Sequence, residues 1–157
     1  MNGKKILTIV ALLAAVCVLA IFIGERSSAP KLGAPFTGEV NTYPGVTMTL
    51  VGEAMPGCVT VEVLNTTGAE IDSGNEHDFA IQQEVDGVWY SLEYEPKPNT
   101  AEALIYSTDE PRQLTFSWAR RHGSLPEGKY RVVKGFFEYR GPGDYTDFLL
   151  AAEFTLD

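Results

Sequence analysis

The sequence predicts an all-β domain, built as an antiparallel sandwich of two sheets, with one apolar helix before it. Short runs in which apolar and polar residues alternate follow one another from Val46 onward, and turn residues separate them at intervals of about 8–12 residues. No run with a helical period follows residue 23. A polar turn, Pro126-Glu127-Gly128, leads directly into a β-rich run that begins at Tyr130. Strands joined by turns, without intervening helices, favour a sandwich.

The chain begins with a predicted membrane anchor. Residues 6–23 are apolar apart from Thr8, and Lys4 and Lys5 precede them. A helix needs about 20 apolar residues to cross the hydrocarbon core of a bilayer. Because flanking lysines stay in the cytoplasm, residues 1–5 are expected to be a short cytoplasmic tail and the C-terminal domain to be extracytoplasmic, in a single-pass membrane protein. The alternative is a signal peptide, whose apolar core has about 7–15 residues and whose cleavage would release a secreted domain.

Residues 24–45 are predicted to be a linker, and residues 46–157 the folded domain. The linker is rich in Gly, Ser, Ala and Pro and shows no periodicity, which is typical of semi-extended segments. The chain carries a net charge of −9, which repels nucleic acid and other polyanions. We therefore expect no nucleic-acid partner, and the charge favours basic or calcium-bearing partners.

Eight strands are expected within the domain, from alternation and from β-branched and aromatic content. Their predicted ranges are Val46–Leu50, Val59–Val63, Phe79–Val85, Val88–Glu93, Ala103–Ser107, Leu114–Trp118, Tyr130–Tyr139 and Phe148–Leu156. Asp86-Gly87 joins the third strand to the fourth, because Asp-Gly accepts the positive φ angles of a type I′ turn. Lys134 has the same parity as Tyr130, so a bulge at Gly135 is expected to reset the buried face.

The turn before the seventh strand has the pattern of a tyrosine corner. Leu125 and Gly128 precede Tyr130, which enters the strand two residues after the glycine. In such a corner the phenol packs under the turn, and its hydroxyl bonds a backbone group a few residues upstream. We expect the other strands to pack around this one.

Four segments resemble the bacterial immunoglobulin-like domains of anchored or secreted Gram-positive proteins. They are Asp78–Glu93, Leu114–Trp118, Leu125–Phe136 and Leu150–Leu156. The resemblance covers residues 46–157 and implies an immunoglobulin-like sandwich at a cell envelope, with no catalytic residues and no agreed ligand. Val132 stands two residues after Tyr130, where antibody-type domains have a cysteine, so apolar packing has to replace the inter-sheet disulfide.

Two further residue types bear on the core. Cys58 is the single cysteine of the domain, so no disulfide can form within it, and a small buried core residue is favoured over a nucleophile. Trp89 and Trp118 are both candidates for the centre of the core, and the sequence leaves that choice open.

The candidate binding site is the predicted loop Gly141–Gly143 with its flanks Tyr139, Arg140 and Tyr145. Tyrosine and arginine beside glycine are typical of recognition loops, because they give a large contact area at low entropic cost. The end loops of a sandwich are its usual binding sites. The alternative is that the aromatic residues form a cross-strand pair that only stabilises the hairpin.

Three other polar clusters have competing interpretations. The oxygen-rich loop Asp72–Asp78 could hold calcium, although a solvated turn in which Asp78 or Asn75 bonds its own backbone is favoured. The basic cluster Arg120–His122 could receive an anion, although counter-charge for nearby acids is favoured. Asn65-Thr66-Thr67 fits a glycosylation pattern, but a turn is expected.

These observations predict an interaction module rather than an enzyme. The chain lacks the motifs of nucleophilic, metal-dependent and phosphate-binding catalysis, so no catalytic residue, cofactor or metal is assigned. We expect a membrane-tethered, extracytoplasmic domain that binds a protein or another envelope component. The alternative is a proteinase-inhibitor-like or ligand-sensing module of the envelope, in which an end loop enters a cleft or reports a small ligand.

Overall fold

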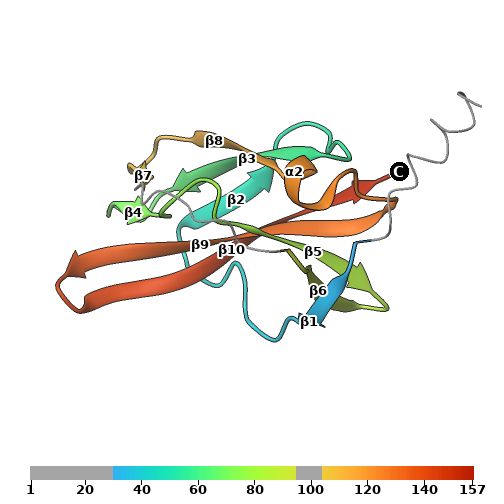
Figure 1. Cartoon of the computed structure of the whole chain (residues 1–157). Helices are drawn as coiled ribbons and strands as arrows, with labels where there is room; N and C mark the ends of the chain where they lie inside the picture. Colours follow the sequence, from blue (N-terminus) through green and yellow to red (C-terminus); the bar gives the residue numbers. More distant parts are fainter. Residues whose placement is uncertain (1–29, 95–103) are drawn as a thin grey trace, which may run out of the picture.

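The computed structural model describes residues 30–94 and 104–157, which form two antiparallel sheets packed face to face (Figure 1). The smaller sheet contains three strands, β2 (Val46–Leu50), β3 (Cys58–Asn65) and β8 (Arg112–Ser117). The larger sheet contains β1 (Leu32–Pro35), β4 (Ile71–Asp72), β5 (Ala80–Val85), β6 (Val88–Leu92), β7 (Ile105–Tyr106), β9 (Gly128–Gly141) and β10 (Asp144–Leu156). The predicted antiparallel β-sandwich is confirmed.

The long hairpin of β9 and β10 is the spine of the larger sheet. Strand β10 pairs with one edge of β9 along its whole length. On the other edge, β5 pairs with β9 up to Val133, and β4 pairs with it at Phe137 and Glu138. No described strand pairs with residues 134–136 on that second edge.

The predicted membrane-spanning helix, residues 6–23, lies outside the described residues, so it stays a prediction. Within residues 30–94 and 104–157, no helix is long and apolar enough to span a bilayer. The single described helix is the short α2 (Ala119–His122), which follows β8.

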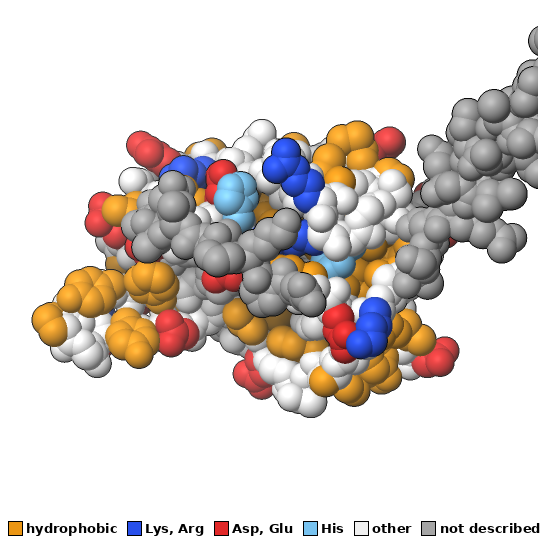
Figure 2. All heavy atoms as spheres, in the orientation of Figure 1, with side chains coloured by type: hydrophobic (Ala, Val, Ile, Leu, Met, Phe, Trp, Pro, Cys, Tyr) orange, Lys and Arg blue, Asp and Glu red, His pale blue; other side chains and the backbone are white. Residues whose placement is uncertain are grey.

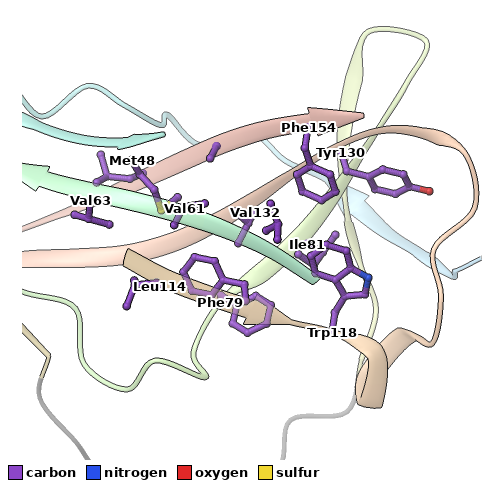
Figure 3. Packing of buried hydrophobic residues seen from close by; sticks show 14 of the residues in the cluster. Met48, Val61, Val63, Phe79, Ile81, Leu114, Trp118, Tyr130, Val132 and Phe154 are labelled. Carbon is purple, nitrogen blue, oxygen red and sulfur yellow. The ribbon is translucent and has the colours of Figure 1, made fainter. Parts of the chain in front are cut away.

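The core lies between the sheets and is centred on aromatic side chains from three segments (Figure 3). The rings of Trp118 and Tyr130 each stack on the ring of Phe154, with centroid separations of 5.4 and 5.8 Å. Trp118 has no exposed surface, and its indole N–H donates to the Pro56 carbonyl. The central tryptophan is therefore Trp118, whereas Trp89 is half-buried and its ring lies against Arg131.

The tyrosine corner is confirmed. Tyr130 is fully buried, and its hydroxyl donates a hydrogen bond to the carbonyl of Pro126, four residues upstream. In Figure 3 the ring lies beside Phe154, and its hydroxyl end points away from Phe154 and Trp118, toward the turn before β9. The bond gives the hydroxyl of the buried tyrosine a partner, which it would otherwise lack at the end of the sandwich.

Part of the predicted linker, residues 24–45, is instead integrated into the sandwich. Strand β1 pairs with β6, and the amide of Phe36 donates to the carbonyl of Trp89. The side chain of Asn41 bonds both the amide and the carbonyl of Ala151, so it extends the hydrogen-bonding of the β10 edge. Composition suggested a linker because this segment has no alternating apolar pattern. The segment is held instead by hydrogen bonds to neighbouring strands.

The bulge predicted at Gly135 is wrong, because the β9–β10 register runs without a shift from Tyr145 to Leu156. Lys134 therefore faces inward, as its parity requires, and is 1% exposed. Its ammonium donates to the carbonyls of Asn75 and Asp78 at 2.7 and 3.1 Å. These bonds make a buried lysine tolerable without any change of face.

Cys58 is half-buried rather than part of the core, which corrects the sequence-based expectation. It begins β3, in which Val59, Val61 and Val63 face the core. Because side chains alternate along a strand, the residue before Val59 faces the other way.

Candidate functional site

The β9–β10 hairpin extends past the smaller sheet and ends in a narrow tip (Figure 1). Two residues, Pro142 and Gly143, connect its strands. Gly143 has a φ of 77°, a left-handed conformation that glycine adopts without steric cost. The turn is therefore compact, and the residues beside it are held on strands rather than on a loose loop.

The tip brings the two predicted tyrosines together. Tyr139 and Tyr145 are directly opposite one another in the hairpin register. Their side chains are 58% and 56% exposed, and neither ring stacks on another aromatic ring among the described residues. Figure 2 shows apolar side chains gathered at this end of the molecule. The arrangement offers a partner two aromatic surfaces from a fixed backbone.

Arg140 lies on the opposite side of the hairpin from this tyrosine pair, because side chains alternate along the strand. Its guanidinium donates to Asp144 at 3.0 Å and to Thr146 at 2.9 Å, and it pairs with Glu138 at 3.1 Å. The hydrogen bond to Asp144 raises the Arg140 pKa above its ordinary value. Arg140 therefore ties the two strands together, which sequence reasoning did not distinguish from a free contact residue.

Tyr43 braces the same side of the hairpin. Its ring stacks on that of Phe148, with centroids 4.0 Å apart and planes 9° apart. Its hydroxyl donates to the carboxylate of Glu138, and this bond is the main reason that the Tyr43 pKa is raised. The hairpin is thus supported close to its tip by a residue from the segment that precedes β2.

The oxygen-rich loop Asp72–Asp78 forms the turn that was favoured over a calcium site. The side chain of Asn75 accepts from the amide of His77, and that of Asp72 accepts from the amide of Gly74. The ammonium of Lys134 donates hydrogen bonds to the carbonyls of Asn75 and Asp78. Among the described residues, no group of three or more potential ligands is arranged to hold a metal ion.

The basic cluster Arg120–His122 forms helix α2, and its central residue is used internally. The Arg121 guanidinium lies 4.6 Å from the ring centroids of both Phe79 and Tyr94. It also donates to the carbonyls of Phe79 and His77. Burial, helped by Arg121, lowers the pKa of His122. Among the described residues, the contacts of Arg121 are thus with rings and carbonyls rather than with carboxylates, and they fasten α2 to the segment that leads into β5.

Asn65-Thr66-Thr67 is a structural turn, as expected. The side chain of Asn65 is fully buried and donates to the carbonyls of Ala69 and Tyr106. It also accepts from the amide of Thr67. Its amide nitrogen is therefore engaged inside the domain.

Comparison with known proteins identifies the family of the domain. The family model of the bacterial Ig-like domain matches residues 42–155. No curated protein and no solved structure matches the chain. The family match covers most of the chain and all of the described strands except β1, and it agrees with the resemblance seen in the four sequence segments. The chain belongs to the bacterial Ig-like domain family.

Proposed function

We propose that this protein is an interaction module of the bacterial envelope that binds a partner protein through the tip of its β9–β10 hairpin. The observation that carries the proposal is the tyrosine pair. Tyr139 and Tyr145 are more than half exposed at the end of a hairpin that projects from the sandwich. Exposed tyrosines on a rigid support are typical of recognition surfaces.

The proposed location of the module rests on the apolar run before the domain. Residues 6–23 have the length and flanking lysines of a membrane anchor. An anchored domain of this family would present the hairpin to partners outside the cytoplasm. Cleavage of the apolar run would give the same module in secreted form.

The inhibitor-like alternative receives less support from the same hairpin. A loop that blocks a proteinase cleft has to offer an extended segment with a free backbone. Here the turn is limited to Pro142 and Gly143, and the pairing of β9 with β10 continues to Gly141 and Asp144. No catalytic role is proposed, because the side chains of the hairpin tip form no nucleophile–base pair.

The proposal is tested by capture of partners from envelope extracts, with the full chain as bait in a nonionic detergent. The variant Tyr139→Thr/Tyr145→Thr removes both rings and keeps β-branched residues that suit a strand. Met55→Thr is the matched control, because Met55 is 57% exposed and lies outside the hairpin. Proteins retained by the wild type and by the control, but lost with the double variant, would support the tip. Equal capture by all three would contradict it.

A further inference from the structure

Arginine is held between two aromatic rings at two places in this domain. The first is the outer face of the larger sheet, where the guanidinium carbon of Arg131 lies 4.3 Å from the ring centroid of Trp89 and 5.0 Å from that of Phe36. Arg131 donates one hydrogen bond to Gln82 and forms no salt bridge with a described carboxylate. Its charge is accommodated largely by ring faces, which attract a cation.

The second arginine fastens helix α2. The guanidinium carbon of Arg121 lies 4.6 Å from the ring centroids of both Phe79 and Tyr94. It too forms no salt bridge with a described carboxylate. In both places one guanidinium is matched with two rings, which suits its planar and weakly hydrated structure.

The hairpin tip presents a further pair of rings, and among the described residues no cation lies over it. Tyr139 and Tyr145 are directly opposite one another in the hairpin register, so their side chains project from the same side. No described lysine or arginine lies over either ring. The two rings do not stack on one another, so their own contact does not close the space between them.

The pair lies on the part of the hairpin that projects past its neighbouring strands (Figure 1). Strand β4 pairs with β9 at Phe137 and Glu138. From Tyr139 onward, β10 is the only described strand that pairs with β9. This projection explains why both tyrosines are more than half exposed.

The tip carries more negative than positive charge. Residues 138–147 contain three carboxylates and one guanidinium, those of Glu138, Asp144, Asp147 and Arg140. The guanidinium is matched by two of the carboxylates, at 3.1 and 2.9 Å, on the side of the hairpin away from the tyrosine pair. The whole chain carries a net charge of −9. A cation is therefore the charged group whose approach to the rings is favoured.

We propose that the tyrosine pair of the tip receives an arginine side chain of the partner protein. A guanidinium stacks on aromatic faces and is less strongly hydrated than the ammonium of lysine, so arginine is preferred to lysine. The arrangement would repeat at the tip what Arg121 and Arg131 do within the domain. The inference rests on the proposed function in that the tip is the recognition surface, and it names the side chain that the tip recognises.

The test follows the tyrosines by fluorine NMR, with 3-fluorotyrosine incorporated into the full chain in a nonionic detergent. The chain has seven tyrosines, and the signals of Tyr139 and Tyr145 are assigned by their loss in Tyr139→Phe and Tyr145→Phe. The probe is acetyl-Gly-Arg-Gly-amide, and the matched control peptide has citrulline, which keeps the shape of arginine without its charge. We expect the arginine peptide to shift both tip signals saturably, and the lysine and citrulline peptides to shift them less.

Substitutions separate the ring faces from general apolar contact. Tyr139→Leu and Tyr145→Leu each remove one ring, and the signal of the remaining tip tyrosine reports binding. Each should weaken binding of the arginine peptide by about two- to fivefold, as expected for one cation–π contact at an exposed site. The phenylalanine variants keep the rings and should bind more tightly than the leucine variants. Met55→Leu, outside the hairpin, should bind as the wild type does.

The inference would be overturned if the arginine peptide shifted neither tip signal, or if the citrulline peptide shifted them equally. Equal weakening by the phenylalanine and leucine variants would also overturn it, because the hydroxyls rather than the rings would then carry the binding. The signals of the other tyrosines, unchanged from the wild type, show that each variant is folded.

The inference and the proposed function fail in different ways. If Tyr139→Thr/Tyr145→Thr loses captured partners but the arginine peptide shifts neither tip signal of the wild type, the tip proposal stands and the arginine inference fails. If the arginine peptide shifts both signals but the double variant still captures every partner, the affinity of the pair for arginine stands and the tip proposal fails.

Discussion

The hydroxyl of Tyr130 donates a hydrogen bond across 3.0 Å to the carbonyl of Pro126. This bond fixes the turn from which β9 begins, and β9 in turn organises the larger sheet through its pairing with β4, β5 and β10. The ring of Tyr130 is part of the same aromatic stack as Phe154 and Trp118. A local turn and the centre of the core therefore depend on one side chain.

Tyr130→Phe should lower the free energy of unfolding by about 1–3 kcal/mol, because the Pro126 carbonyl loses its partner while the ring still fills its place. Chemical denaturation measures the change. Tyr139→Phe is the control, since its exposed hydroxyl has no hydrogen-bond partner among the described residues. A loss for Tyr130→Phe that does not exceed the control would mean that the corner bond contributes nothing.

Burial lowers the pKa of Lys134 to about 8 from its ordinary value of 10.5, against the opposing effect of Asp78, Asp72 and Glu76. Below pH 8 the folded and unfolded chains both carry this proton, and the cost of the buried charge is present in full. Between about pH 8 and 10.5 the folded chain has released the proton and the unfolded chain has kept it, so this residue makes stability rise with pH. The slope is at most about 1.4 kcal/mol per pH unit.

Lys134→Met should remove this contribution. We expect the difference in unfolding free energy between the wild type and Lys134→Met to move in favour of the wild type as pH rises through that window. Urea denaturation at several pH values measures it, and subtraction cancels the tyrosines that titrate nearby. A difference that does not change with pH would show that Lys134 titrates at its ordinary value.

The segment before β2 should be required for full stability. A chain that starts at Lys31 keeps β1, Asn41 and Tyr43, and should fold without residues 1–30, as seen by circular dichroism. A chain that starts at Val46 loses the pairing of β1 with β6 and the Tyr43–Phe148 stack, and should melt at a lower temperature. Asn41→Ala alone should cost about 1–2 kcal/mol, because it removes two hydrogen bonds to Ala151. If the two chains have the same melting temperature, residues 31–45 contribute nothing to stability and act only as a linker.

The sequence was sufficient to predict the strands in which apolar and polar residues alternate, and to predict the tyrosine corner. Val46–Leu50 was predicted with the bounds that β2 has, and the seventh and eighth predicted strands lie within β9 and β10. Alternation reports burial on one face, which is the pattern along β2, although β9 and β10 are also buried on both faces at Tyr130–Lys134 and Leu150–Ala152. Strand β1 escaped prediction because its residues, LGAP, are largely exposed and are held by backbone pairing.

The candidate site was only partly predictable. Turn chemistry indicated the hairpin, and the register then places Tyr139 opposite Tyr145. The sequence did not indicate that Arg140 donates hydrogen bonds to Asp144 and Thr146. The neighbouring segments decide which side of a hairpin is solvated, and the sequence alone does not show where they lie.

The central claim is that the tyrosine pair serves recognition and not merely the hairpin. The most direct test measures two quantities on the same protein, Tyr145→Thr: the affinity for a partner captured by the wild type, and the melting temperature. Recognition predicts an affinity loss of about 1–2 kcal/mol, as for a central contact, with a melting temperature close to that of the wild type. A lower melting temperature with unchanged affinity would mean that the pair only stabilises the hairpin, and would contradict the account.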